Sequence, residues 1–382
     1  MVTFDREALQ KYVCSIRRDI HRHPEISGQE FRTAQLIRNE LDKMGIPYKT
    51  VGTGTVAEIM GTEKGMTVAL RADIDALSVT EETGLEFESE NVGVMHACGH
   101  DFHTSALLGC AKVLSEHPEM VKKGKLLLLF QSAEETAQGA LELLHSGILN
   151  DVDLYMGMHV GIGIPAGVIN IEAGPREAAA GMFKIEIEGS SGHGAMPHQT
   201  VDAVVVGSQI VNALQSVVSR NVDPLKPAVI TVGTFNAGER FNVVAGKAVL
   251  TGTMRAYEPE VCKLIEEKLL QITENIATMN NAEAKVELKW IVPPLINNKE
   301  YTEQFADYLQ NKAGFSTITM EKVTGAEDFA YYAEKAPGVF AFFGIEDEEH
   351  KYPNHHSKFA YNEELLSEGS RLYLSFVECY CS

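Results

Sequence analysis

The chain has 382 residues, of which 45% are hydrophobic and 23% charged, a composition typical of a water-soluble globular protein. Its 33 basic and 53 acidic residues give a net charge of −20, which argues against nucleic acid and anionic membranes as partners. No stretch approaches the roughly 20 apolar residues of a membrane span, and residues 1–6 lack a signal-peptide pattern. The 6 cysteines are scattered without a CxxC pair, so we expect a cytoplasmic protein with reduced thiols.

The first half of the chain alternates between two hydrophobic patterns. Helical periodicity predicts helices over residues 5–23, 29–44, 103–116 and 136–146. Continuous apolar runs predict buried strands over residues 57–60, 67–70, 125–130 and 154–158. Because apolar strands separated by helices form sheets that are covered on both faces, we predict an α/β fold with a mostly parallel sheet.

The pattern changes near residue 179. Residues 183–188 alternate between apolar and polar side chains, which indicates a strand with one buried and one solvated face. The segments that follow are predicted as a helix over 202–220, strands near 228–235 and 247–255, a helix over 258–279 and a strand over 286–290. The resulting order, βαββαβ, is that of the split βαβ, ferredoxin-like α+β arrangement.

After about residue 300 the first pattern resumes, with a buried strand over 339–343 and a final helix near 362–378. Single hydrophobic cores stop growing at roughly 250–300 residues, so a chain of this length is expected to form two domains. We therefore predict a discontinuous α/β domain over 1–178 and 291–382, with an inserted α+β domain over 179–290.

Potential metal ligands and catalytic acids directly follow three of the predicted strands: Asp73, the pair Glu134 and Glu135, and His159. In open α/β sheets, sites form beyond the carboxyl ends of the strands, so these side chains are expected at one rim of the sheet. Cys98 and His100 lie in the loop before the helix predicted over 103–116. The sequence thus brings a thiol, imidazoles and carboxylates to one edge.

One thiolate, two imidazoles and one carboxylate make up most of a coordination shell for a divalent transition metal. A second carboxylate beside a ligand carboxylate is what a metal-activated water needs as a base, which favours a metallohydrolase. Two other classes stay open on these residues. One is an amidase with Cys98 as its nucleophile and His100 as the base; the other is a catalytically silent metal-binding protein, against which the intact pair Glu134 and Glu135 argues.

Several motifs in order along the chain resemble the M20 metallopeptidase family. More narrowly, they resemble its amidohydrolase branch of aminoacylases, hippurate hydrolases and auxin-conjugate hydrolases. The motifs occupy residues 71–77 (Arg-Ala-Asp-Ile-Asp-Ala-Leu), 95–101 (Met-His-Ala-Cys-Gly-His-Asp), 131–135 (Gln-Ser-Ala-Glu-Glu), 192–198 (Gly-His-Gly-Ala-Met-Pro-His), 252–255 (Gly-Thr-Met-Arg), 325–329 (Gly-Ala-Glu-Asp-Phe) and 354–359 (Asn-His-His-Ser-Lys-Phe). The chain departs from the family at Ser78 and Ser357, where proline is common.

The resemblance implies two divalent metal ions, Mn²⁺ or Zn²⁺, with Co²⁺ or Ni²⁺ also suited to the donors. Their ligands would be Cys98, as a bridging thiolate, with His100, Glu135, His159 and His355. His355 is favoured over its neighbour His356 by counting back from Phe359, although the sequence leaves both open. Glu134 would be the general base, and Asp73 would orient a ligand imidazole from behind.

The resemblance also implies that the inserted domain is a lid and a dimerisation domain, in a homodimer or homotetramer. His193 would stabilise the oxyanion, in its own or a neighbouring subunit's site, Asn242 would offer a further donor, and Arg255 would bind a substrate carboxylate. The implied substrate is a small molecule, an N-acyl-L-amino acid with an acetyl, benzoyl or similar group. A dipeptidase or carboxypeptidase of the same family is the alternative, and the sequence fixes neither the acyl group, the metal nor the pathway.

Overall fold

The computed structural model describes residues 4–382. The chain forms two compact units: the first takes in the chain up to Gly174, Ile296–Glu321 and Tyr331–Ser382, and the second comprises Pro175–Leu295 and Lys322–Ala330. The sequence placed residues 322–330 in the first domain, and here it was wrong. These residues join the second unit because Ala178 N–H donates to the carbonyl of Gly325 at 2.9 Å and the Tyr257 hydroxyl donates to the carbonyl of Val323. The predicted first domain begins at residue 1, and residues 1–3 lie outside the described part.

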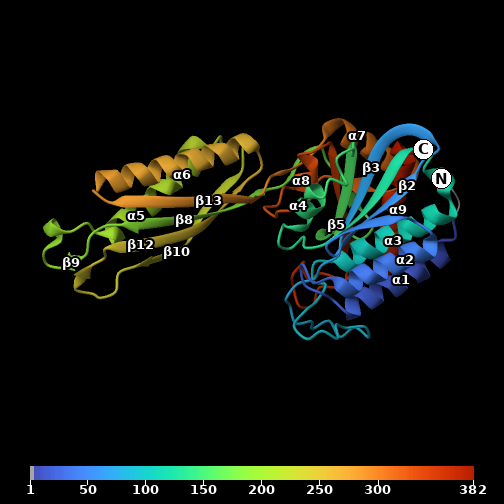
Figure 1. The fold of residues 1–382 in the computed structure, drawn as a ribbon, viewed down its shortest axis with the longest axis horizontal. Coiled ribbons are helices and arrows are strands. Elements are labelled where there is room, and N and C mark those ends of the chain that lie inside the picture. The colour runs from blue at the N-terminus through green and yellow to red at the C-terminus, as the bar shows by residue number, and fades with distance from the viewer. Residues whose placement is uncertain (1–3) are drawn as a thin grey trace. The chain divides into compact units, whose positions relative to one another are not determined.

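A mixed sheet forms the centre of the first unit, with the strand order β1-β2-β4-β3-β5-β16-β6-β15 (Figure 1). Its strands are β1 (Tyr48–Val51), β2 (Gly54–Met60), β3 (Glu63–Asp73), β4 (Lys123–Gln131), β5 (Leu154–Pro165), β6 (Ile169–Asn170), β15 (Thr317–Ile318) and β16 (Gly338–Glu346). The neighbours β4, β3, β5 and β16 are parallel, whereas β1 and β2 add to one side in antiparallel fashion. The predicted α/β fold is confirmed, and the parallel strands that the sequence predicted form the middle of a large mixed sheet.

The helices of this part of the chain are α1 (Arg6–Arg22), α2 (Phe31–Met44), α3 (His100–Glu116), α4 (Gly139–His145), α7 (Lys299–Tyr308), α8 (Ala330–Ala333) and α9 (Leu366–Tyr380). Helix α3 is buried along most of its length because α1, α9 and β3 all pack against it. It begins three residues earlier than predicted, directly after Gly99, whose φ of 91° turns the chain into the helix. His100 therefore lies in the first turn of a buried helix.

The sequence predicted that His159 follows its strand, but His159 lies inside β5. Strand β3 pairs with β5 only as far as Gly157, but β16 pairs with β5 from Tyr155 to Gly161 and again at Pro165. Pairing with β16 thus extends β5 past the end of its other neighbour. His159 consequently lies in a segment of β5 that pairs with β16 on one side. On the other side, near the end of β3, this segment has no pairing with β3.

The second unit is built on an antiparallel sheet with the order β10-β12-β8-β13 (Figure 1). Its long elements along the chain are β8 (Ala179–Glu188), α5 (Ala203–Ser216), β10 (Ala228–Ala237), β12 (Lys247–Ala256), α6 (Pro259–Met279) and β13 (Glu283–Val292), a βαββαβ order. The buried side chains of β8 pack with those of both helices in one apolar core, and the polar residues of β8 face the other side. The helix predicted over 202–220 ends at Ser216 and continues as a π-helical turn to Asn221.

Four further strands are short. β9 (Gly192–His193) pairs with β11 (Val243–Val244) apart from the main sheet of the second unit. β7 (Gly174–Glu177) and β14 (Leu295–Asn297) lie where the chain passes from one unit to the other. Within residues 4–382, none of the helices has the length and apolar run that crossing a bilayer requires.

Candidate metal centre

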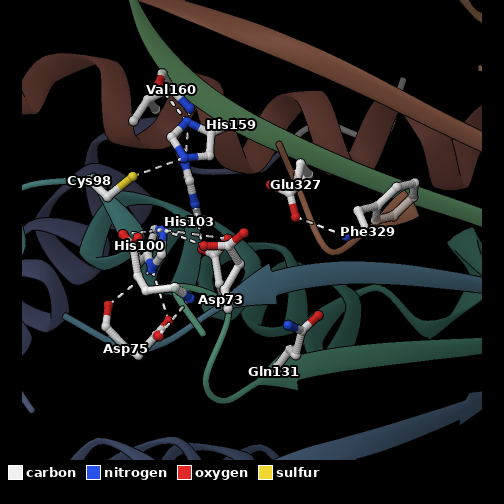
Figure 2. Close-up of polar contacts among 12 residues, drawn as sticks. Asp73, Asp75, Cys98, His100, His103, Gln131, His159, Val160, Glu327 and Phe329 are labelled. Atoms are coloured by element: carbon white, nitrogen blue, oxygen red, sulfur yellow. Dashed lines mark hydrogen bonds and ion pairs between the residues drawn. The ribbon is translucent and has the colours of Figure 1, made fainter. Parts of the chain in front are cut away.

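Five side chains converge at one edge of the sheet in the first unit: Cys98, His100, Glu135, His159 and His355. The Sγ atom of Cys98 lies 3.2 Å from Nε2 of His159 and 3.3 Å from Nε2 of His355. On the other side, Oε1 of Glu135 lies 3.7 Å from Nε2 of His355 and 3.9 Å from Nε2 of His100. Figure 2 shows Cys98 and His159 facing each other above His100. The structure therefore brings all five predicted ligands together.

The donor atoms fall into two overlapping groups. Those of Cys98, His100 and His159 lie within 4.8 Å of one another, and so do those of Cys98, Glu135 and His355. Because Cys98 belongs to both groups, its sulfur has a position suited to bridging two cations. Among residues 4–382, the buried atoms Nε2 of His100 and Oε1 of Glu135 have no hydrogen-bond partner. Buried polar atoms are normally satisfied, so these two unpartnered atoms, each with a free lone pair, fit a bound pair of metal ions.

The structure distinguishes the two neighbouring histidines, His355 and His356. Nε2 of His355 reaches Cys98 and Glu135, whereas the ring of His356 stacks on Tyr352 with centroids 4.6 Å apart. Nδ1 of His356 accepts a hydrogen bond from the backbone of Lys358 at 3.0 Å. The cluster thus contains His355.

Hydrogen bonds behind the cluster fix the direction of two imidazoles. Nδ1 of His100 lies 3.0 Å from the carbonyl oxygen of Asp75 and 3.1 Å from its Oδ1 atom, so it donates and leaves Nε2 facing the cluster. Nδ1 of His159 donates to the carbonyl oxygen of Val160 at 2.7 Å, which likewise leaves Nε2 facing Cys98. Such contacts set the tautomer and orientation of metal-binding histidines.

Asp73, predicted to orient a ligand imidazole, has different direct partners. Its carboxylate accepts hydrogen bonds from Arg71 Nη1 at 2.6 Å and from His103 Nδ1 at 2.5 Å, and lies 3.7 Å from Nε2 of His100 (Figure 2). His103 in turn accepts a hydrogen bond through Nε2 from the backbone N–H of Val160 at 2.9 Å. Asp73 therefore reaches the segment that carries His159 through His103, while Asp75 makes the hydrogen bond to His100.

Sequence reasoning assigned no role to Asp75 or His103. A signal for each was present. Asp75 lies in the same motif as Asp73, and His103 follows His100 by three residues, a spacing that puts both imidazoles on one face of a helix. Asp75 also accepts hydrogen bonds from Ser27 Oγ at 2.6 Å and from the backbone N–H of Glu135 at 3.1 Å. It thus contacts the segments that carry two of the predicted ligands.

The electrostatics of the cluster reflect its burial. Burial raises the pKa of the Cys98 thiol well above its ordinary value and raises the pKa of Glu135, whereas burial lowers the pKa of His159. Burial opposes the charged form of His100 too, but the negative charge of Asp73 and the hydrogen bond to Asp75 help to outweigh it, so the pKa of His100 is raised. A cation beside a thiol stabilises the thiolate outright, so metal ions would reverse the shift at Cys98.

The loop after β4 carries Glu134 and Glu135 side by side. Ala133 has a φ of 50°, a left-handed conformation that is uncommon outside glycine, and its N–H donates to Glu30 Oε1 at 2.9 Å. Glu134 Oε2 lies 4.0 Å from His100 Nε2, and its side chain is 11% exposed. The tight turn thus presents Glu134 at the cluster with limited access to solvent.

The remaining predicted site residues, His193, Asn242 and Arg255, belong to the second unit, and the structure does not join them to the cluster. His193 is exposed on β9, and its Nδ1 accepts a hydrogen bond from Ala195 N–H at 3.0 Å. Asn242 is exposed beside β11. Arg255, on β12, donates through Nη1 to Thr253 Oγ1 at 2.6 Å and to the carbonyl of Met254 at 2.9 Å.

The chain is similar to known proteins over most of its length. Residues 69–378 match the family model described as Peptidase family M20/M25/M40. An N-acetyl-L-cysteine deacetylase of Bacillus subtilis is 41% identical over 364 residues, covering 95% of this chain and 86% of that protein. A thermostable carboxypeptidase of Saccharolobus solfataricus is 37% identical over 374 residues, covering 96% and 94%. The crystal structure of a dinuclear metal-binding M20 peptidase from Bacillus subtilis matches with a TM-score of 0.85 at 34% identity, over 97% of this chain and 98% of that chain.

Proposed function

The chain belongs to peptidase family M20/M25/M40 and is a hydrolase of amide bonds, and on this premise we propose that it cleaves N-acyl-L-amino acids. The products would be a carboxylate, such as acetate or benzoate, and a free amino acid. The observation that carries the proposal is the pair of ligand groups that meet at Cys98 with Glu134 beside them. A relative named for the deacetylation of N-acetylcysteine supports the substrate class.

The residues that would hold the metals are Cys98, His100, Glu135, His159 and His355. Their mixture of sulfur, nitrogen and oxygen donors suits Mn²⁺ or Zn²⁺, and Co²⁺ or Ni²⁺ as well. Two such ions, when bound, would lower the pKa of water toward about 7 and so supply a nucleophile at neutral pH. Proton transfer, stabilisation of the oxyanion and binding of the substrate carboxylate would be carried out by side chains of this chain.

Glu134 would act as the general base. Both adjacent glutamates belong to a candidate donor group with His100, but of the two only Glu135 also shares a group with Cys98 and His355, which supports Glu134 for proton transfer. Its carboxylate would take a proton from water as the water attacks the acyl carbon, and would then deliver that proton to the leaving nitrogen of the amino acid. A single carboxylate thereby serves both halves of the reaction.

Residues of the second unit would bind the substrate as this unit acts as a lid. His193 accepts a hydrogen bond at Nδ1, so its neutral ring carries the proton on Nε2 and can donate to the oxyanion of the tetrahedral intermediate. Arg255 would pair with the α-carboxylate of the substrate, and Asn242 would add a donor. In a chain with a net charge of −20, an anionic substrate needs such local donors.

A carboxypeptidase or dipeptidase activity is the second candidate, and the relative named as a carboxypeptidase favours it. The same base and the same ligands would serve that reaction, so the acyl-side pocket decides between them. A cysteine-nucleophile amidase has less support. Activated thiols have lowered pKa values, whereas burial raises the pKa of Cys98.

A metal-exchange experiment with three substrate classes tests the proposal. Protein stripped with a chelator should not release amino acid from N-acetyl or N-benzoyl amino acids, and should regain activity with Mn²⁺, Zn²⁺, Co²⁺ or Ni²⁺. Full activity of the stripped protein would refute the metal role. Faster cleavage of dipeptides than of acylated amino acids would favour the peptidase, and inactivation by an alkylating agent in metal-free, active protein would favour the cysteine nucleophile.

A further inference from the structure

The segment that carries His355 has a backbone that needs support. Residues 353–358 contain no helix or strand, and His355 has a φ of 70°, in the left-handed region. Side chains other than glycine rarely adopt this conformation, and it persists where the surroundings hold it in place. His355 N–H donates to the carbonyl of Ala97 at 2.7 Å, which fixes one point of the segment.

A second point is fixed by the side chain of the preceding residue, Asn354. Its Nδ2 atom donates to the carbonyl oxygen of Cys98 at 3.0 Å and to the carbonyl oxygen of Val160 at 3.3 Å. Both partners are acceptors only, so the amide can satisfy them in one orientation alone, with its nitrogen toward them. The geometry of the contact thus follows from its chemistry.

These two carbonyl groups belong to the backbone segments that position the predicted ligands Cys98 and His159. The first belongs to Cys98 itself. The second is the carbonyl of Val160 that accepts the hydrogen bond from Nδ1 of His159 at 2.7 Å, so the amide of Asn354 and the ring of His159 share one acceptor. A shift of this carbonyl would turn the His159 ring.

We propose that Asn354 is a positioning residue for the metal centre. One amide group ties together the three chain segments that carry Cys98, His159 and His355, and thereby sets the distances between their donor atoms. The inference rests on the proposed function of the cluster as a metal centre. The hydrogen bond between His355 and Ala97 joins backbone atoms and does not involve the Asn354 side chain. Loss of the Asn354 amide would therefore loosen the ligand geometry and leave the segment in place.

The same segment offers a matched control in Ser357. Its hydroxyl donates to Glu82 Oε2 at 2.7 Å, and its carbonyl accepts from the backbone N–H of Glu82 at 2.8 Å. These contacts tie the segment to residue 82 and touch neither Cys98 nor Val160. Ser357→Ala therefore removes a side-chain tether of equal kind with no direct path to the other ligands.

The experiment compares Asn354→Ala, Asn354→Ser and Ser357→Ala with the unaltered full chain. Metal affinity is measured by competition with a chromophoric chelator for Zn²⁺, and the charge-transfer absorption of the Co²⁺ form reports on the bond to Cys98. The urea midpoint of the metal-free proteins shows whether each variant folds. Asn354→Ser retains one donor, so it keeps the inference testable if Asn354→Ala does not fold.

We expect Asn354→Ala to weaken Zn²⁺ binding by about 10–100-fold, the range for groups that orient metal ligands, and to shift the Co²⁺ charge-transfer band. Ser357→Ala should have the smaller effect on both, and the metal-free urea midpoints should agree. Unaltered metal affinity and spectrum in Asn354→Ala, or equal losses in Asn354→Ala and Ser357→Ala, would overturn the inference alone. An unaltered chain that binds no metal would overturn the proposed function, and this inference with it.

Discussion

The adjacent carboxylates Glu134 and Glu135 have different polar contacts, and this difference supports the roles proposed for them. Glu135 has a buried Oε1 atom with no hydrogen-bond partner among residues 4–382, and its backbone N–H is held by Asp75. Glu134 Oε2 lies 4.0 Å from His100 Nε2, close to the 3.9 Å of Glu135 Oε1, but within residues 4–382 it shares no candidate donor group with Cys98. A ligand must lie beside the other ligand atoms, whereas a base must reach both the water and the leaving nitrogen.

Substituting each glutamate by its neutral isostere should separate the two roles. Glu134→Gln should lower kcat by about 10²–10⁴-fold, the usual contribution of general base catalysis, with metal content unchanged. Glu135→Gln should lose metal as well as activity. Steady-state kinetics and elemental analysis of the same samples provide the measurement. Loss of metal in Glu134→Gln, or normal kcat in that variant, would contradict the assignment.

At the level of single residues, the sequence could predict which side chains gather, because their chemistry and their place after apolar runs are local. It could not predict that Asp75, and not Asp73, makes the hydrogen bond to His100. The two aspartates are two residues apart, and the contact depends on how α3 packs beside the end of β3. Asn354 was missed for the same reason, since its partners are 194 and 256 residues away in the chain.

At the level of elements, the metal centre depends on the unequal lengths of parallel strands. β3 ends at Asp73 and β4 at Gln131, whereas β5 runs on to Pro165 because β16 pairs with it. The apolar runs predicted the buried middle of each strand, where burial is continuous. They could not predict the extension of β5, because the residues beyond Val160 are rich in glycine and are held by pairing with a strand more than 180 residues further along the chain.

The turn from the Cys98 loop into α3 depends on Gly99. It has a φ of 91°, and a Cβ atom there would lie 2.4 Å from Val160 Cγ2. Gly99→Ala should destabilise the metal-free protein by about 2–5 kcal/mol, because it adds a steric clash to the cost of a left-handed conformation. Urea unfolding measures the change.

Gly45, which ends α2 with a φ of 68°, is the matched control because a Cβ atom there would meet nothing within 4 Å. Gly45→Ala should lose only the conformational part, about 1–2 kcal/mol. If Gly99→Ala cost no more than Gly45→Ala, the close approach of Gly99 to β5 would not matter for stability.

At the level of the whole molecule, one buried acid should make stability depend on pH. Glu177, in the second unit, has a buried Oε2 atom without a hydrogen-bond partner among residues 4–382. Burial, and then the charge of Glu327, raise its pKa from 4.5 to about 8. Between pH 4.5 and about 8, the folded protein therefore keeps a proton on Glu177 that the unfolded chain releases. The stabilising effect of this proton is complete below pH 4.5 and is lost as the pH rises through about 8.

The free energy of unfolding should thus fall more steeply with rising pH in the unaltered protein than in Glu177→Gln. The difference in slope is expected to approach about 1.4 kcal/mol per pH unit between roughly pH 5 and 8, the value for one proton. Urea unfolding across this range measures it. Glu186→Gln, which changes a partly exposed carboxylate on β8, should leave the slope unaltered. Equal slopes in the unaltered protein and Glu177→Gln would contradict the prediction.

The second unit also has a surface suited to self-association. In its sheet, β10 lies at one edge, with Val229 39% and Phe235 37% exposed, and the adjacent α5 exposes Val204 and Val205. An edge strand with exposed apolar side chains can pair with the same strand of a second copy. We expect a homodimer or homotetramer by light scattering, and a shift to monomer in Val229→Lys. Met279→Lys, at a 70% exposed position on α6, should retain the assembly, and a monomeric unaltered chain would contradict the prediction.

Assembly through the second unit would decide whose centre His193 serves. We expect it to act in the partner's centre, and two inactive variants can test this. In mixed dimers of Glu134→Gln and His193→Ala, action across subunits leaves one centre with an intact base and an intact oxyanion donor, while the other centre lacks both. Random exchange of subunits should then restore about a quarter of the unaltered activity, because half of the dimers are mixed and half of their centres are complete. If verified exchange restored none, every centre would lack one of the two groups, and His193 would act within its own subunit.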